Sequence, residues 1–188
     1  MELFENKTFD KIHTTGPFSK GEYENCIFKN CDFSSADLSN SKFIECQFLN
    51  CNLSLANLLN STLRDVKFKD CKMLGLLFYK CNEFGLVFSI EGCNLSHSSF
   101  YQTKIRNTSF VSSNLSEVDF SECDLSSSML DRCDLMNAKF ENTILEKVDF
   151  RSSFNYSIDP MLNRIKKAKF SLTGLAGLLD KYDIEIES

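Results

Sequence analysis

Nine cysteines have the most specific chemistry in this sequence, because thiolates bind metals and thiols form disulfides. Metal sites need closely spaced ligands, yet no Cys-x-x-Cys pair is present. Every cysteine instead occupies the same step of a five-residue pattern, in which Ala, Ser, Thr and Val also occur. A free cysteine packs as a small hydrophobe, so we interpret the nine as core residues and predict no metal or other cofactor. They are Cys26, Cys31, Cys46, Cys51, Cys71, Cys81, Cys93, Cys123 and Cys133.

Residues suited to catalysis are scarce. His13 and His97 are the only histidines, and His97 falls at an outward step of the pattern. Serines are abundant but lack a nucleophile motif, and the sequence has no glycine-rich phosphate loop. We therefore predict no catalytic residue and no enzyme activity.

Features that the sequence lacks also bear on its binding partners and its location in the cell. The sequence has no basic patch, so we predict no nucleic-acid partner. It also has no run of about eighteen apolar residues, so we predict no membrane span. The first residues lack the apolar core of a signal peptide. Many reduced thiols are also typical of a cytoplasmic protein, so we expect a cytoplasmic location.

A strict five-residue repeat positions all of these side chains. A bulky apolar residue recurs at every fifth position from Phe28 to Phe78 and again from Leu95 to Phe150, with a small residue two positions earlier. This period fits neither a strand nor a helix. The residue between the two is often Asp or Asn, which readily bonds nearby backbone, so we interpret those carboxylates as structural.

The repeat resembles the pentapeptide-repeat proteins. The resemblance is carried by Cys26-Ile27-Phe28, Cys31-Asp32-Phe33, Ala36-Asp37-Leu38, Cys46-Gln47-Phe48 and Ala56-Asn57-Leu58. It implies an all-β, right-handed quadrilateral β-helix with twenty residues per coil. We expect this solenoid over residues 1–152, with a weaker first coil over 1–25.

Residues four repeats apart should then stack in columns. One bulky column is expected to hold Phe28, Phe48, Phe68, Phe88, Phe110, Leu130 and Phe150; another is expected to hold Leu38, Leu58, Phe78, Phe100, Phe120 and Phe140. Two irregularities interrupt them. Glu83 occupies a bulky step, so we expect a bulge that turns Glu83 outward and buries Phe84. The step from Phe88 to Leu95 is two residues too long, which predicts a protrusion within 89–92.

Residues 153–188 are expected to form a C-terminal capping and dimerisation segment. Asp159-Pro160 predicts a short α-helix over 161–167, Ser171 a second helix to about Lys181, and the alternation at 183–187 a strand. Its apolar residues favour a homodimer. They are Leu172, Leu175, Leu178, Leu179, Ile184 and Ile186.

Two surface features suggest a protein partner. Residues 111–150 hold nine acidic and three basic residues, a net charge of −6, although four of the acids stand at the structural step. The remaining acids are Glu117, Glu122, Asp131, Glu141 and Glu146; a solvated face is the alternative interpretation. Separately, Leu59, Tyr79 and Tyr101 should stack on the outside as an apolar contact strip, with chance as the alternative.

The tail narrows the resemblance to quinolone-resistance and topoisomerase-poison immunity proteins. Asp159-Pro160, Asn163-Arg164-Ile165 and residues 174–186 resemble their C-terminal segment. This implies a homodimeric DNA mimic that binds DNA gyrase or topoisomerase IV. Several members of this branch need long projecting loops for protection, and only a two-residue excess interrupts this repeat. The alternatives are a general interaction scaffold and an immunity factor against a peptide toxin that targets gyrase.

Overall fold

The computed structural model describes residues 2–13 and 18–186. Short parallel strands dominate this part of the chain. They are β1 (Glu2–Glu5), β2 (Thr8–Asp10), β3 (Gly21–Glu24), β4 (Ile27–Lys29), β5 (Lys42–Ile44), β6 (Gln47–Leu49), β7 (Thr62–Arg64), β8 (Val66–Lys69), β9 (Phe88–Glu91), β10 (Ser109–Val111) and β11 (Met129–Asp131).

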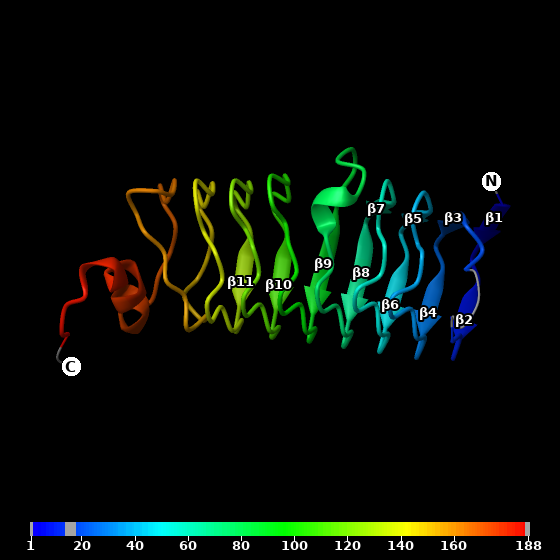
Figure 1. The fold of residues 1–188 in the computed structure, drawn as a ribbon, viewed down its shortest axis with the longest axis horizontal. Helices are drawn as coiled ribbons and strands as arrows, with labels where there is room; N and C mark the ends of the chain where they lie inside the picture. The colour runs from blue at the N-terminus through cyan, green and yellow to red at the C-terminus, as the bar shows by residue number, and fades with distance from the viewer. Residues whose placement is uncertain (1, 14–17, 187–188) are drawn as a thin grey trace.

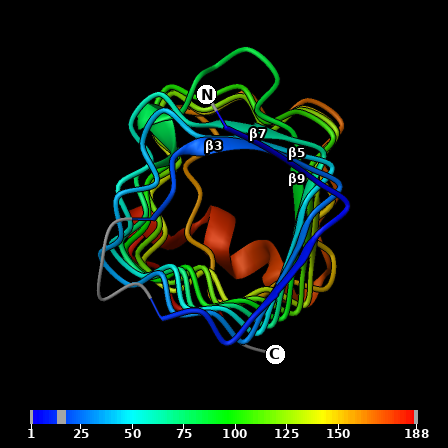
Figure 2. The same ribbon diagram turned by 90° about the vertical axis from the view of Figure 1, so that its right-hand side faces the viewer.

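The strands form two sides of a rod. One sheet has the order β1-β3-β5-β7 and the other β11-β10-β9-β8-β6-β4-β2. Isolated parallel bridges twenty residues apart, such as Asp32 with Asn52 and Asp37 with Asn57, form the other two sides. Figure 1 shows the coils stacked along one axis, and Figure 2 shows four sides when the rod is viewed from its N-terminal end. The predicted right-handed quadrilateral β-helix is confirmed.

Each corner depends on one residue in the left-handed backbone region. Asn25, Asn30, Ser35 and Asn40 have φ between 49° and 58°, and the series continues at five-residue steps. Asn tolerates this region better than most residues, since its short side chain bonds to local backbone. With one corner every five residues, four corners complete one coil of twenty residues.

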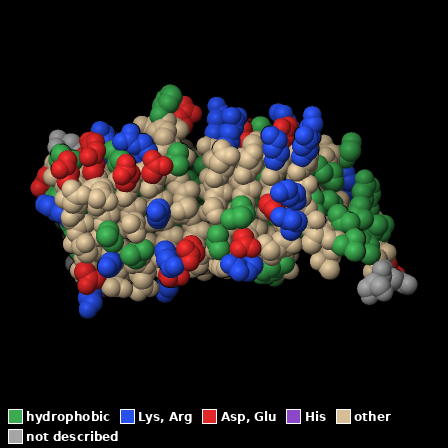
Figure 3. All heavy atoms as spheres, turned by 180° about the vertical axis from the view of Figure 1, so that it is seen from behind, with side chains coloured by type: hydrophobic (Ala, Val, Ile, Leu, Met, Phe, Trp, Pro, Cys, Tyr) green, Lys and Arg blue, Asp and Glu red, His purple; other side chains and the backbone are tan. Residues whose placement is uncertain are grey.

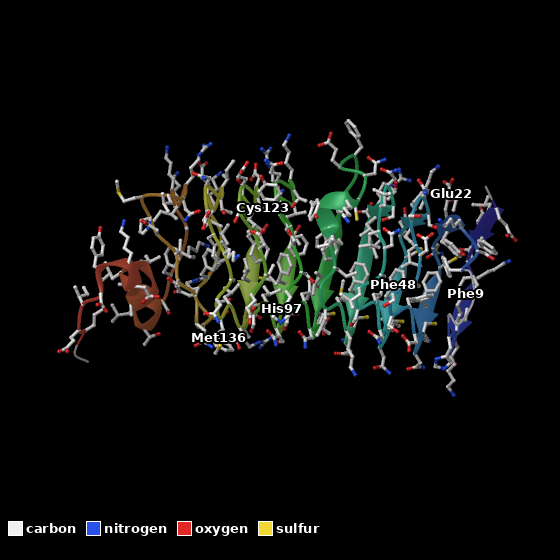
Figure 4. All side chains as sticks on the ribbon, in the orientation of Figure 1. Phe9, Glu22, Phe48, His97, Cys123 and Met136 are labelled. Atoms are coloured by element: carbon white, nitrogen blue, oxygen red, sulfur yellow. The ribbon has the colours of Figure 1, made fainter. Side chains whose placement is uncertain are left out.

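The stacked columns form the core. The Phe28 and Phe48 rings lie 4.7 Å apart, and the Phe78 and Phe100 rings 4.3 Å apart, both in stacked geometry. Figure 4 shows Phe48 inside the rod, while His97 and Met136 lie along one edge. Burying each phenylalanine contributes roughly 1.5–3 kcal/mol, so repeated stacking stabilises a long, thin molecule.

The cysteines lie in the predicted small positions. All nine are free, and all except the half-buried Cys81 are buried. The backbone N–H of Cys31 points to the Cys51 sulfur at 3.4 Å, and the same contact joins Cys51 to Cys71. Burial raises the pKa of Cys31 to about 11, so this thiol stays protonated, as a core residue does.

The intervening Asp and Asn residues have the predicted backbone role. The Asp32 carboxylate accepts the Ser34 N–H at 3.0 Å, and Asp124 accepts the Ser126 N–H at 3.0 Å. Each side chain thereby closes a turn at the end of its own side.

The irregularity near Glu83 differs from the prediction. Phe84 is 80% exposed, whereas Leu86 is buried. Ile90, rather than Phe88, pairs with Phe68 and Phe110 in the bulky column. The protrusion is therefore a loop over 82–86, visible above β9 in Figure 1, and residues 88–91 are the strand β9.

Packing explains this register. Phe88 pairs with Val66, which stands at a small position, and its ring stacks on Phe78 at 5.4 Å. The loop leaves one bulky position of this coil without its regular residue. Leu86 and Phe88 are both buried beside the loop, while Glu83 is exposed as expected.

The tail also differs from the prediction. No helix forms over 161–167; instead Arg164 bridges Ile144 and Lys169 bridges Asp149. The Phe170 ring stacks on Phe150 at 5.3 Å. The repeat thus resumes after a short interruption and extends well beyond residue 152.

The cap itself is made of 3₁₀ turns rather than α-helices. They are η2 (Thr173–Leu178) and η3 (Asp180–Tyr182), and another such turn, η1 (Phe78–Lys80), lies within the coils. The residue directly before η2 is Leu172 rather than the predicted cap Ser171, although the Ser171 hydroxyl accepts the Gly174 N–H at 3.1 Å. A side chain at Gly174 would overlap Tyr156, so the backbone lies directly on the last coil. Residues 183–186 form no strand, and Glu187 lies outside the described residues.

Candidate functional site

Side-chain chemistry is sparse in the described part of the chain. No group of three or more His, Cys, Asp or Glu residues there is placed to hold a metal ion. The exposed His97 has its Nδ1 3.0 Å from Glu117. None of the described helices is long and apolar enough to cross a membrane.

The structure separates most of the predicted acidic residues. Glu117, Asp131 and Glu146 each follow a different side of the coil and stand at different corners. Glu117 faces His97, and Glu146 pairs with Arg164 at 2.6 Å. Asp131 lies 3.1 Å from Arg132 and accepts a hydrogen bond from Ser152. These three do not form one acidic face.

Glu122 and Glu141 do lie together. The backbone N–H of Glu122 donates to the carbonyl of Glu141 at 2.7 Å, so they stand at one corner in adjacent coils. The Glu122 carboxylate accepts hydrogen bonds from the Tyr101 hydroxyl (3.2 Å) and the Gln102 amide (2.8 Å). Both donors are neutral, and Glu141 forms no ion pair with a described residue. Both negative charges remain uncompensated.

The predicted apolar strip occupies the same corner. Tyr79 is 44% exposed, and its ring meets that of Tyr101 edge-on at 6.4 Å. Leu59 precedes them by one coil, because the adjacent Asn60 N–H donates to the carbonyl of Lys80. We call this row the aromatic–acidic corner; it consists of Leu59, Tyr79, Tyr101, Glu122 and Glu141.

A pocket borders this corner. Its volume is about 400 Å³, and the 82–86 loop forms part of its wall. The lining includes Tyr79, Tyr101, Lys104, Glu83 and Leu86. The sequence prediction missed this pocket because it placed the extra residues after Phe88.

The predicted dimerisation residues are mostly exposed at the C-terminal end. Leu172 is 86% exposed, and Leu175, Leu179, Ile184 and Ile186 are also open to solvent, whereas Leu178 packs against the core. Met161, Leu162 and Tyr182 are further exposed apolar residues in the last part of the chain. Figure 3 shows hydrophobic side chains gathered at this end of the rod. Patches of this kind on soluble proteins mark contact surfaces.

Known structures share this architecture. A trypsin-treated variant of QnrB1, described as a plasmid-mediated fluoroquinolone resistance protein, is 20% identical, with a TM-score of 0.63 over 98% of this chain and 97% of that chain. Full-length QnrB1 is 19% identical, with a TM-score of 0.58 over 97% of this chain and 100% of that chain. At these identities the likeness shows the fold.

Sequence comparison identifies the family. No curated protein sequence matches the chain. The profile described as "Pentapeptide repeat region" matches residues 22–89 and 87–155, which is more than half of the chain and includes the 82–86 loop. The chain therefore belongs to the pentapeptide-repeat family.

Proposed function

We propose that this protein is a non-enzymatic, DNA-mimicking rod that binds DNA gyrase or topoisomerase IV and protects it from quinolones or another topoisomerase poison. It would act in the cytoplasm as a homodimer joined through the C-terminal patch. The observation that carries the proposal is the likeness to QnrB1, a fluoroquinolone resistance protein, over both the coils and the tail.

The aromatic–acidic corner is the binding surface in this proposal. Proteins that hold duplex DNA contact its backbone charge with basic side chains. Glu122 and Glu141 present two uncompensated carboxylates in adjacent coils, about 4.8 Å apart along the axis. A basic groove would face these charges, and Tyr79 and Tyr101 would add apolar contact next to them.

A general interaction scaffold is the second candidate. The exposed Tyr79 beside the half-buried Tyr101 supports it, because aromatic residues are enriched at protein interfaces. The two candidates differ in what binding requires. A DNA mimic depends on the carboxylates and competes with duplex DNA, whereas a scaffold contact through the tyrosines does neither.

The test is binding to gyrase in competition with duplex DNA. The informative variant is Glu122→Lys with Glu141→Lys. The matched control is Asp70→Lys with Glu91→Lys, because these acids also share a corner in adjacent coils, with the Asp70 N–H bonded to the Glu91 carbonyl at 2.9 Å.

The proposal expects wild type and control to bind and to be displaced by DNA, while the Glu122/Glu141 variant binds at least about tenfold more weakly, which corresponds to about 1.4 kcal/mol. DNA mimicry through this corner would be rejected if duplex DNA did not displace the protein from gyrase. It would also be rejected if both double variants lost the same amount of gyrase affinity.

A further inference from the structure

A second corner of the rod has opposite charges at its two ends. It consists of the turns that lead into the strands of the seven-stranded sheet, and we call it the inter-sheet edge. Its turns stack in register, because Asn25, Glu45 and Lys147 each donate a backbone N–H to the next coil. The N-terminal half carries Glu5, Glu24, Glu45 and Asp65 beside one basic residue, Arg64, and the C-terminal half carries Arg106, Lys147, Lys166 and Lys167 beside one acidic residue, Glu146. In Figure 3, acidic side chains gather along the upper edge on the N-terminal side of the projecting loop, and basic side chains predominate on its other side.

Most of these charges have no partner within the described chain. No ion pair involves the four acids or the three lysines. Arg106 is the exception, since it binds the buried Asp124 at 2.6 Å. The two halves of the edge thus remain negative and positive, and each is free to attract a complementary surface.

The loop over 82–86 marks the midpoint of the edge. Counting coils backward from the loop gives the turns of Asp65, Glu45 and Glu24. Counting forward gives the turns of Arg106, Ser127 and Lys147. Glu24 and Lys147 are therefore equally distant from the loop, on opposite sides. At the loop itself, Phe84 is 80% and Val87 49% exposed.

We propose that a second copy of this chain docks along the inter-sheet edge in antiparallel orientation, with Phe84 of both copies near the two-fold axis. A two-fold axis perpendicular to the rod reverses its direction, so each acidic half faces the basic half of the other copy. Glu24 then meets Lys147 of the second copy, and Glu5 meets Lys167. A parallel arrangement would instead place like charges together.

The strength of this contact depends on salt. Single exposed ion pairs contribute about 0–1 kcal/mol, but the symmetry doubles each pair, and burial of Phe84 adds an apolar centre. Screening acts over about 10 Å at 0.1 M salt and about 3 Å at 1 M. This lateral contact is separate from the apolar C-terminal patch and does not depend on the proposed gyrase binding.

The experiment is a charge swap in full-length protein carrying Leu172→Asp, which removes apolar contact at the C-terminal end. The variants are Glu24→Lys, Lys147→Glu and the two combined. Both replacements suit the backbone, because Lys29 and Lys69 stand at positions equivalent to Glu24, and Glu45 and Glu122 at positions equivalent to Lys147. The control is Glu141→Lys, at another corner.

Sedimentation velocity at low salt and at about 0.5 M salt measures the association. We expect a dimer at low salt that dissociates at high salt, weakening of at least about tenfold in each single variant, and recovery in the combined variant. Glu141→Lys should leave the dimer unchanged. Absence of a low-salt dimer, or a combined variant as weak as the single ones, would overturn the proposal.

Discussion

The hydroxyl of Tyr101 donates a hydrogen bond to the carboxylate of Glu122 in the next coil, at 3.2 Å. This bond connects two features that the sequence presents separately, an apolar strip and a set of acids. It also holds a negative charge beside the pair formed by the exposed Tyr79 and the half-buried Tyr101. The rod therefore offers a partner one continuous corner with an apolar part and an acidic part.

Phe110 tests the stacked core. Its side chain is fully buried between Ile90 and Leu130. We expect Phe110→Ala to lower the free energy of unfolding by about 3–5 kcal/mol, because it leaves a cavity in a tightly packed column. Denaturant unfolding measures this, with Met129→Ala, an exposed position, as the control. A loss below about 1 kcal/mol would contradict the packing.

The loop tests the corrected register. Phe84→Ser should change stability by less than about 0.5 kcal/mol, since the side chain lies in solvent. Ile90→Ala should cost about 2–5 kcal/mol, because Ile90 fills the column between Phe68 and Phe110. Thermal or denaturant melts distinguish the two. The reverse ranking would mean that Phe84 is the core residue.

The C-terminal patch tests the homodimer. We expect Leu172→Asp to yield monomers at high salt, because it places a charge within an exposed apolar patch. Light scattering gives the mass. Leu55→Asp is the matched control, since Leu55 is 67% exposed but lies far from this end. A wild-type protein that is monomeric, or a dimer that survives Leu172→Asp, would count against association through this patch.

Asp149 tests the electrostatics of the last coils. Hydrogen bonds from Arg151 are the largest influence and lower the pKa of Asp149 to about 2, against a smaller opposing effect of burial. A carboxyl whose pKa is lower in the folded than in the unfolded state stabilises the fold above its unfolded pKa of about 3.8. This stabilisation is lost as the pH falls toward 2.

Asp149→Asn should therefore flatten the acid side of the stability curve. Unfolding free energy, measured from pH 6 down to about pH 2, should fall less in the variant than in wild type. Identical pH dependence in both proteins would show that Arg151 does not lower this pKa in solution.

Much of the fold could be predicted because the repeat leaves little choice. A strict period of five gives each residue one role, so the inward position of Cys51 and the turn role of Asp124 follow directly from the pattern. Counting the five-residue repeat forward from Phe78 through Glu83 places the loop too late in the sequence. Counting backward from Cys93 and Leu95 places Phe88 and Ile90 where the structure has them. This register is hard to recognise from the sequence, because the large Phe88 stands at a position that normally holds a small residue.

The candidate site could be predicted only in part. Acids five residues apart, such as Glu117 and Glu122, stand at successive corners, so a net charge over 111–150 does not define one face. The secondary structure of the C-terminal cap could not be predicted from the spacing of its leucines alone. Close contact between Gly174 and Tyr156 shapes it into short 3₁₀ turns, and that contact depends on the end of the coil being in place.

The most direct test of the proposed function is a gyrase supercoiling assay with a quinolone. The protein should restore supercoiling in the presence of the drug, the Asp70→Lys/Glu91→Lys control should do the same, and Glu122→Lys/Glu141→Lys should need at least about tenfold more protein. A folded wild-type protein that gives no protection and no measurable gyrase binding at concentrations well above that of the enzyme would contradict the proposal.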